Sequence, residues 1–158
     1  MIVVGYQGIG KSTLAGRNNK FIDLESSNFW IDGKRADDWY KPYCKIAEHL
    51  SQQGYIVFTS SHEVVREYLV DNSSEIVVLA YPSIKLKEAW IEKLEQRYCY
   101  DATEKNYKAL MNAKDRYEDN IRELQESCIE YKLEFQKIDY DLEASLIHLN
   151  NEIARVNV

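Results

Sequence analysis

The chain has 158 residues, a formal net charge of −6, 45% hydrophobic residues and 29% charged residues. These values are typical of one globular domain with a single core, and they exclude an intrinsically disordered chain. The negative charge argues against binding to duplex nucleic acid, and the sequence contains no apolar run of the roughly 18–20 residues that a membrane span needs. We therefore expect neither duplex nucleic acid nor a membrane as a partner.

A nucleotide-binding motif lies at the start of the chain. The β-branched run from Ile2 to Val4 predicts a strand that is buried on both faces. Residues 5–12 then read GYQGIGKS and match G-x-x-x-x-G-K-[ST] at every defined position, and a helix is predicted to begin at Thr13. Glycines let backbone N–H groups turn inward around a phosphate, and a helix N-terminus adds partial positive charge. This context predicts a P-loop that binds ATP.

The individual positions of the P-loop have distinct expected roles. We expect Lys11 to reach the β- and γ-phosphates and the Ser12 hydroxyl to ligate Mg²⁺. The residues expected to bind the nucleotide are Gly5, Gly8, Ile9, Gly10, Lys11, Ser12 and Thr13. Lys11 is also the first candidate for a catalytic residue, because phosphoryl transfer depends on neutralising the charge of the transferred group.

A second strand is predicted over residues 21–25, and it ends in the acidic residues Asp23 and Glu25. Open α/β sheets bind ligands outside the carboxyl ends of their strands. Asp23 can hold Mg²⁺ or take a proton from a substrate hydroxyl, and Glu25 projects to the same side and can contact the substrate. The alternative is a pair of solvated loop carboxylates.

Residues 29–43, FWIDGKRADDWYKPY, combine aromatic and basic side chains. Aromatic faces next to cations suit a nucleobase that carries a phosphate. We expect this stretch to be an acceptor-binding flap in which Arg35 binds the acceptor phosphate. An equally weighted alternative is that the aromatic residues only pack the segment onto the sheet.

A third strand is predicted over residues 55–59, after a helix that ends near Gly54, and it lacks the aspartate expected after a Walker B run. The turn that follows offers Ser60 and His62 as substrate contacts, although a histidine here also suits a helix cap. Arg66 lies one turn into the next helix and can reach a substrate anion, with a solvated surface arginine as the alternative.

The second half of the chain is mostly helical and charged. After a predicted strand over residues 75–81, residues 84–130 predict a helical lid in which Arg97 and Arg116 close over phosphates. The apolar spacing from Tyr107 to Tyr131 also suits a coiled coil, so we expect a monomer or a homodimer. Alternating residues over 133–138 predict a fifth strand at a sheet edge, followed by a closing helix.

The predicted elements alternate between strand and helix, which indicates an α/β fold with a parallel sheet and helices on both faces. One P-loop kinase domain over residues 1–158 accounts for this arrangement. The three cysteines, Cys44, Cys99 and Cys128, are widely spaced and include no C-x-x-C pair, which favours reduced thiols in a cytoplasmic protein.

The P-loop and the five-strand length together resemble the nucleoside monophosphate kinase and shikimate kinase-like group of P-loop kinases. FIDLE resembles that group's F-I-D-x-D segment, which implies magnesium binding by Asp23 and a substrate contact by Glu25. FTSSHEVVREYL is similar in position to its strand, turn and helix at the acceptor, although the group has glycines at Ser60 to His62. WIEKLEQRY resembles the start of a lid, which implies a phosphate contact by Arg97.

The resemblance implies the strand order 2-3-1-4-5 and ATP- and Mg²⁺-dependent phosphoryl transfer to a small acceptor. The flap composition favours a (deoxy)nucleoside monophosphate as the acceptor, and the overall composition resembles compact phage-type deoxynucleoside monophosphate kinases. One alternative is a kinase that acts on a hydroxyl of a nucleoside, sugar or antibiotic. The other is a nucleotide-binding switch or ATPase that uses its long helix to contact a partner.

Overall fold

Five parallel strands form one sheet in the computed structural model, which describes residues 1–156. The strands are β1 (Ile2–Gly5), β2 (Phe21–Asp23), β3 (Ile56–Thr59), β4 (Val77–Pro82) and β5 (Tyr131–Phe135). Their order in the sheet is β2-β3-β1-β4-β5, and every neighbouring pair is parallel. The predicted α/β class and the predicted strand order are both confirmed.

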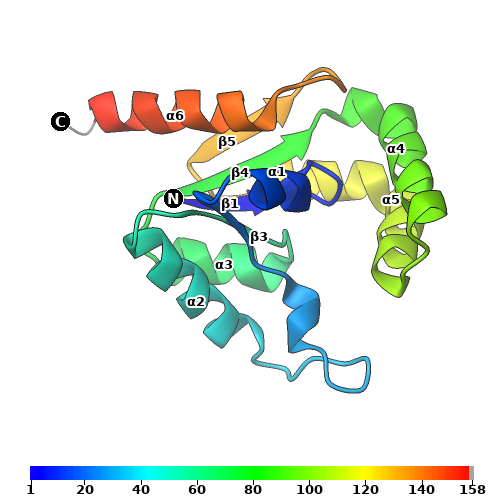
Figure 1. Cartoon of the computed structure of the whole chain (residues 1–158), viewed down its shortest axis with the longest axis horizontal. Helices are drawn as coiled ribbons and strands as arrows, with labels where there is room; N and C mark the ends of the chain where they lie inside the picture. The colour runs from blue at the N-terminus through cyan, green and yellow to red at the C-terminus, as the bar shows by residue number, and fades with distance from the viewer. Residues whose placement is uncertain (157–158) are drawn as a thin grey trace.

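Helices cover both faces of the sheet (Figure 1). They are α1 (Lys11–Arg17), α2 (Tyr40–Gln52), α3 (Glu63–Asn72), α4 (Lys87–Tyr100), α5 (Glu104–Gln125) and α6 (Leu142–Val156), with short 3-10 turns η1 (Ser26–Phe29) and η2 (Ile84–Leu86). In Figure 1, α2 and α3 lie on one side of the strands and α6 lies on the other. Right-handed crossovers between parallel strands require this division between the two faces.

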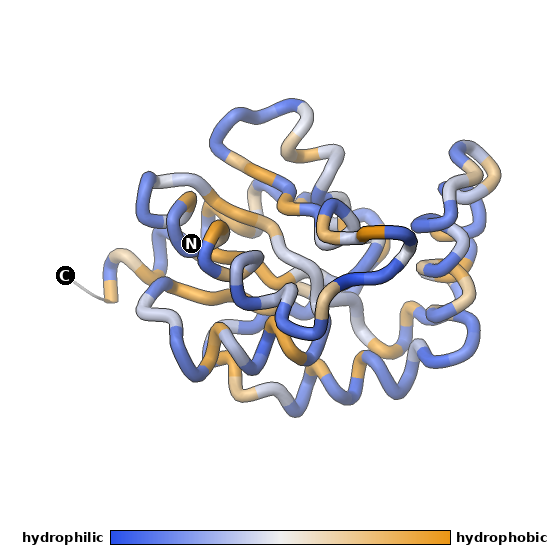
Figure 2. Tube along the Cα trace, turned by 90° about the horizontal axis from the view of Figure 1, so that it is seen from below, coloured by the Kyte–Doolittle hydropathy of each residue, from blue (hydrophilic) through white to orange (hydrophobic). Residues whose placement is uncertain are grey.

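The core is centred on β1, between β3 and β4. Ile2, Val3 and Val4 are fully buried, as a near-continuous apolar run predicts for a central parallel strand. Burying each such side chain contributes about 1.5–3 kcal/mol. Figure 2 shows hydrophobic positions along the inner strands and hydrophilic positions on the surrounding helices. This buried strand gives the loop that follows it a fixed starting point.

Helix α5 contains a kink where it meets the body of the protein. Inside α5, Arg116 has non-helical backbone angles (φ −139°, ψ 17°), which divide the helix into two parts. Directly after the kink, Tyr117 is buried and donates a hydrogen bond from its hydroxyl to the carbonyl of Ser83 (2.8 Å). Helix α4 packs against α5 at the end of the sheet where the P-loop lies (Figure 1).

The structure differs from the sequence prediction in the segment before α6. The long helix ends at Gln125 instead of near Tyr131, and β5 covers Tyr131–Phe135 instead of residues 133–138. The buried Ile129 lies in the connection between the two elements. The helical spacing continued past Gln125 only through Cys128, which is exposed, and Tyr131, which begins β5. Within residues 1–156, no helix is both long and apolar enough to cross a membrane.

Candidate functional site

A cavity of about 600 Å³ opens at the carboxyl ends of β1, β2 and β3. Its walls come from the P-loop, the segment after β2, the turn after β3, and helices α4 and α5. The sequence-predicted residues that line it are Gly5, Gly8, Gly10, Lys11, Ser12, Thr13, Asp23, Glu25, Arg35, Ser60, His62, Arg66 and Arg97. The fold therefore gathers residues from distant stretches of the sequence around one space, as the strand-end rule predicts.

The P-loop has the backbone that an anion cradle needs. Gly8 and Gly10 have φ values of +88° and +106°, a region in which side-chain-bearing residues are strained. The N–H of Leu14 donates to the carbonyl of Gly10 (3.0 Å) as the first hydrogen bond of α1. The preceding N–H groups of the helix therefore point out of its open N-terminus, where they suit a phosphate. The residues present fit a nucleoside triphosphate.

The seven residues expected to bind the nucleotide do not all present side chains to the cavity. Ile9 is 2% exposed, and its side chain packs under the loop, where its Cδ1 would lie 2.6 Å from a Cβ added at Gly5. A larger residue at position 5 would therefore require the Ile9 side chain to move. Ile9 thus supports the loop from below and, unlike the other six residues, does not line the cavity.

Lys11 lies across the floor of the cavity. Its ammonium group donates to the carbonyls of Gly5 (2.9 Å) and Thr59 (3.4 Å), which tie it to the ends of β1 and β3. Desolvation lowers the pKa of Lys11 to about 8, and the nearby carboxylate of Asp23 partly opposes this change. The chain thus holds a poorly solvated cation next to the P-loop, and a bound phosphate would stabilise its charge.

Asp23 and Glu25 form a hydrogen-bonded pair of carboxyl groups near Lys11. Burial raises the pKa of Asp23 to about 6, and its hydrogen bond with Glu25 adds to the shift. Burial also opposes ionisation of Glu25, but hydrogen bonds from Lys105 of α5 and from Asp23 outweigh it and lower the pKa of Glu25. Glu25 is therefore joined to α5 through an ion pair, and Asp23 lies near Lys11 of the P-loop.

The chemistry of these donors fits Mg²⁺ in the way that kinases bind it. The Ser12 hydroxyl and the Asp23 carboxylate both line the cavity, and both are oxygen ligands, which Mg²⁺ prefers. Residues 1–156 contain no group of three or more His, Cys, Asp and Glu side chains placed to hold a metal. Mg²⁺ usually has one or two protein ligands of this kind and takes the others from water and substrate phosphates.

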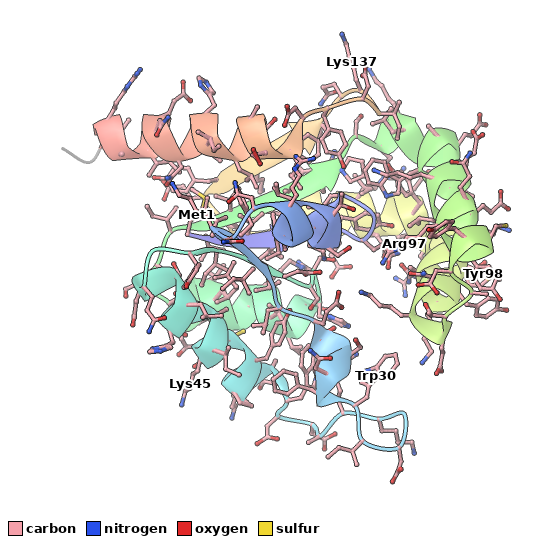
Figure 3. All side chains as sticks on the ribbon, in the orientation of Figure 1. Met1, Trp30, Lys45, Arg97, Tyr98 and Lys137 are labelled. Atoms are coloured by element: carbon pink, nitrogen blue, oxygen red, sulfur yellow. The ribbon has the colours of Figure 1, made fainter. Side chains whose placement is uncertain are left out.

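The predicted flap contains both of the features that its sequence suggested. Phe29, Trp39 and Tyr43 pack against one another, with ring centres 5.3–6.4 Å apart, as the packing alternative expects. Trp30 and Arg35 instead line the cavity, where the Arg35 guanidinium lies 5.7 Å from the Trp30 ring centre and 4.4 Å from that of Trp39. Figure 3 shows Trp30 at the end of η1, on the side that faces α5.

His62 links the flap to the turn after β3. Its Nε2 lies 3.2 Å from Arg35 Nη2, and its Nδ1 lies 2.7 Å from Ser60 Oγ. Desolvation and then the positive charge of Arg35 lower the pKa of His62 to about 4, so the ring is neutral at pH 7. The His62 side chain makes no capping hydrogen bond to α3, although the residue occupies the N-cap position.

Arg66 is not a free cation. It is 7% exposed, donates from Nε to the carbonyl of Ser61 (3.0 Å), and forms an ion pair with Glu123 of α5. The interpretation of Arg66 as a solvated surface residue is wrong, because the side chain is buried. The carboxylate of Glu123 thus already pairs with the charge that was expected to bind an acceptor phosphate.

The two lid arginines lie in different places. Arg97 lines the cavity and extends from α4 toward the P-loop (Figure 3). Arg116 is exposed and is not among the residues that line the cavity, because the kink of α5 buries its neighbour Tyr117 instead. The structure therefore does not place Arg116 over the phosphates as expected.

Two polar contacts of the cavity were missed by the sequence analysis. Gln7 donates from Nε2 to the carbonyl of Ala109 (3.1 Å) and to Oδ1 of Asn112 (3.2 Å), so the P-loop touches the lid directly. Lys108 of α5 lies 4.5 Å from the ring centre of Trp30. Gln7 occupies an undefined position of the motif, and no sequence signal distinguishes it there.

The comparisons with known proteins agree with this architecture. No protein-family model matches the chain, and no curated protein matches it. A shikimate kinase from Bacteroides thetaiotaomicron aligns with a TM-score of 0.51 and 14% identity, over 97% of each chain. An uncharacterized protein from Eubacterium ventriosum aligns with a TM-score of 0.49 and 13% identity, over 98% of this chain and 97% of that chain. The alignment with the shikimate kinase shows that the two chains share an α/β fold.

Proposed function

We propose that this protein transfers the γ-phosphoryl group of ATP to a small acceptor in an Mg²⁺-dependent reaction. The observation that carries the proposal is that one cavity joins the P-loop to the polar ends of β2 and β3. Phosphoryl transfer needs positioning and charge neutralisation more than covalent chemistry by the protein. A cavity with a phosphate cradle at one end and an acceptor space at the other supplies both.

The donor end holds the cations that the reaction needs. Lys11 and the P-loop N–H groups would bind the donor phosphates, and Ser12 and Asp23 would hold Mg²⁺, which neutralises phosphate charge when bound. Arg97 lines the same end and, among residues 1–156, forms no ion pair with a carboxylate. Its charge is therefore available to the transferred group.

A nucleoside monophosphate is the acceptor that the flap supports best. Trp30 offers an aromatic face to the cavity, and the guanidinium of Arg35 lies beside it. Base stacking on an indole and a charge-assisted hydrogen bond to a phosphate are the interactions that such a pair provides. A phosphate acceptor is itself an anionic nucleophile, so this reaction needs no general base.

A hydroxyl acceptor is the second candidate. Two observations, on Arg66 and on Asp23, favour it. The charge of Arg66 is compensated by Glu123, which leaves fewer cations for an acceptor phosphate. Asp23 has its pKa raised toward neutrality and lies at the junction of the two ends of the cavity, where a hydroxyl nucleophile would need a base.

The acceptor screen that tests this proposal measures ADP release from MgATP. The purified protein is incubated with each nucleoside monophosphate, and separately with nucleosides, sugars and hydroxy acids of similar size. We expect at least one compound to raise ADP release well above the rate in water alone. If every compound leaves the rate at the water-only level, the kinase proposal is wrong, and a nucleotide-dependent switch or ATPase takes its place.

A further inference from the structure

Two aromatic side chains outside the cavity hold the back of the P-loop. The indole Nε1–H of Trp90, on α4, donates to the carbonyl of Gln7 (2.9 Å). The hydroxyl of Tyr140, in the loop between β5 and α6, donates to the carbonyl of Ile9 (2.7 Å). Neither Trp90 nor Tyr140 is among the residues that line the cavity. Both hydrogen bonds thus reach the loop from the side opposite to the expected phosphates.

These two carbonyls determine the direction of two N–H groups. In a planar trans peptide unit, the carbonyl of one residue and the N–H of the next point in opposite directions. A carbonyl of Gln7 that is held at the back of the loop therefore turns the N–H of Gly8 toward the cavity. The carbonyl of Ile9 does the same for the N–H of Gly10. Gly8 and Gly10 are the two P-loop residues with positive φ, and both line the cavity.

We infer that Trp90 and Tyr140 are positioning residues that fix the N–H groups of Gly8 and Gly10 in the direction that binds the donor phosphates. The inference rests on the proposed nucleotide binding at the P-loop. A glycine-rich loop has many accessible conformations, and restricting it before binding reduces the entropy that binding costs. The two aromatic donors supply that restriction without touching the nucleotide.

The surroundings of the two donors keep them in place. Trp90 is fully buried, and a Cβ added at Gly8 would lie 3.1 Å from its Nε1 and 3.0 Å from Leu94 Cδ2. The Tyr140 ring stacks on Phe135, with ring centres 3.8 Å apart and an interplanar angle of 12°. A side chain that is packed on both sides has few alternative rotamers, so each hydrogen bond has a fixed direction.

Lys93 determines which way the Tyr140 hydroxyl donates. Its ammonium group lies 3.5 Å from the Tyr140 oxygen and 4.4 Å from the ring centre of Trp90. An ammonium group can only donate hydrogen bonds, so Lys93 lies on the lone-pair side of the Tyr140 hydroxyl. The hydroxyl proton is therefore directed to the carbonyl of Ile9. Burial raises the pKa of Tyr140, which keeps this proton in place. Trp90, Lys93 and Arg97 lie on one face of α4, because successive members are three and four residues apart.

A matched pair of tyrosine variants tests the inference. Tyr140→Phe removes only the hydroxyl that holds Ile9 and retains the ring that stacks on Phe135. Tyr117→Phe also removes one buried hydroxyl, but that hydroxyl donates to Ser83, outside the P-loop. The binding of MgATP and of inorganic triphosphate with Mg²⁺ is measured by calorimetry for both variants and the unmodified protein. Inorganic triphosphate isolates the phosphate cradle from any contact with the base or ribose.

We expect Tyr140→Phe to lower the affinity for both probes by the same factor. That factor is about 2- to 12-fold, which corresponds to the net contribution of one hydrogen bond. Tyr117→Phe should keep both affinities within about twofold of those of the unmodified protein, although it lowers the free energy of unfolding about as much as Tyr140→Phe does. Trp90→Phe, which removes the hydrogen bond to Gln7, should also weaken triphosphate binding. The inference is overturned if Tyr140→Phe binds triphosphate like the unmodified protein, or if it weakens MgATP alone. If the unmodified protein binds neither probe, the proposed function itself fails.

Discussion

Removing the hydroxyl of Tyr43 tests how the acceptor end of the cavity is held together. Tyr43 is fully buried in α2, and its hydroxyl donates to the carbonyl of Leu24 (2.6 Å) and accepts from the N–H of Ser60 (2.8 Å). One oxygen atom therefore joins Leu24, which directly follows Asp23 at the end of β2, to the turn after β3. Tyr43→Phe leaves the Leu24 carbonyl and the Ser60 N–H without this partner.

The expected loss of stability follows from the two hydrogen bonds. Each hydrogen bond contributes a net stability of about 1 kcal/mol, so Tyr43→Phe should lower the free energy of unfolding by about 2 kcal/mol. For a domain of this size, a change of 1 kcal/mol moves the melting temperature by about 2–4 °C, so a decrease of about 4–8 °C is expected. Tyr117→Phe loses a single hydrogen bond, to Ser83 (2.8 Å), and should lower the free energy of unfolding by about half as much.

Urea denaturation, followed by tryptophan fluorescence, measures both variants against the unmodified protein. The same preparations then give the KM of the acceptor, which should rise in Tyr43→Phe because Asp23 and Ser60 are less firmly placed. The KM of MgATP should rise less, since the P-loop makes neither of these hydrogen bonds and only the proposed Mg²⁺ contact of Asp23 is affected. If Tyr43→Phe is no less stable than Tyr117→Phe, the hydroxyl does not join the two segments, and this reasoning is refuted.

Three further predictions concern charged groups of the cavity. Arg35→Ala should raise the KM of the acceptor more than the KM of ATP, and equal effects would remove Arg35 from the acceptor end. Arg97→Met should lower kcat at least about tenfold, which corresponds to about 1.4 kcal/mol of lost transition-state stabilisation. Arg116→Met should leave kcat unchanged. Similar effects of the two variants would place Arg116 at the site after all. By NMR, His62 should titrate well below the ordinary pKa of about 6.5, near 4, and Arg35→Met should raise that value. Because folding lowers this pKa, protonation of His62 costs stability as the pH drops from about 6.5 toward 4, whereas the raised pKa of Asp23 acts in the opposite direction over the same range. The His62 contribution is therefore measured as the difference in unfolding free energy between the unmodified protein and His62→Gln, which should shrink as the pH falls; an unshifted His62 would contradict its burial beside Arg35.

The sequence predicts the parts of the site that depend on local pattern and sheet topology. The P-loop is local, because its glycines, Lys11 and Ser12 follow one another between a strand and a helix. Asp23 and Ser60 lie beside it because the carboxyl ends of β1, β2 and β3 must meet at one edge of a parallel sheet. These residues could be placed around one cavity from the sequence alone.

The remaining parts depend on contacts between distant segments, which one sequence does not reveal. The ion pair between Arg66 and Glu123 joins residues 57 positions apart, so the burial and compensation of Arg66 could not be predicted. The kink at Arg116 interrupts a pattern that is helical on both sides, and it turns the predicted phosphate contact away from the cavity. Trp90 and Tyr140 have the appearance of ordinary core residues in the sequence, although each donates a hydrogen bond to the P-loop.

The most direct measurement of the central claim identifies the phosphorylated product by ³¹P NMR, after incubation with MgATP and the acceptor that most raises ADP release. The account predicts a product signal equivalent to one phosphorylated acceptor for each ADP formed, either the α- and β-phosphorus resonances of a diphosphate from a nucleoside monophosphate or the single resonance of a phosphate monoester from a hydroxyl acceptor. Lys11→Met should abolish that signal while the protein stays folded. If ADP appears together with inorganic phosphate alone, or if Lys11→Met still forms the product, phosphoryl transfer at this P-loop is contradicted.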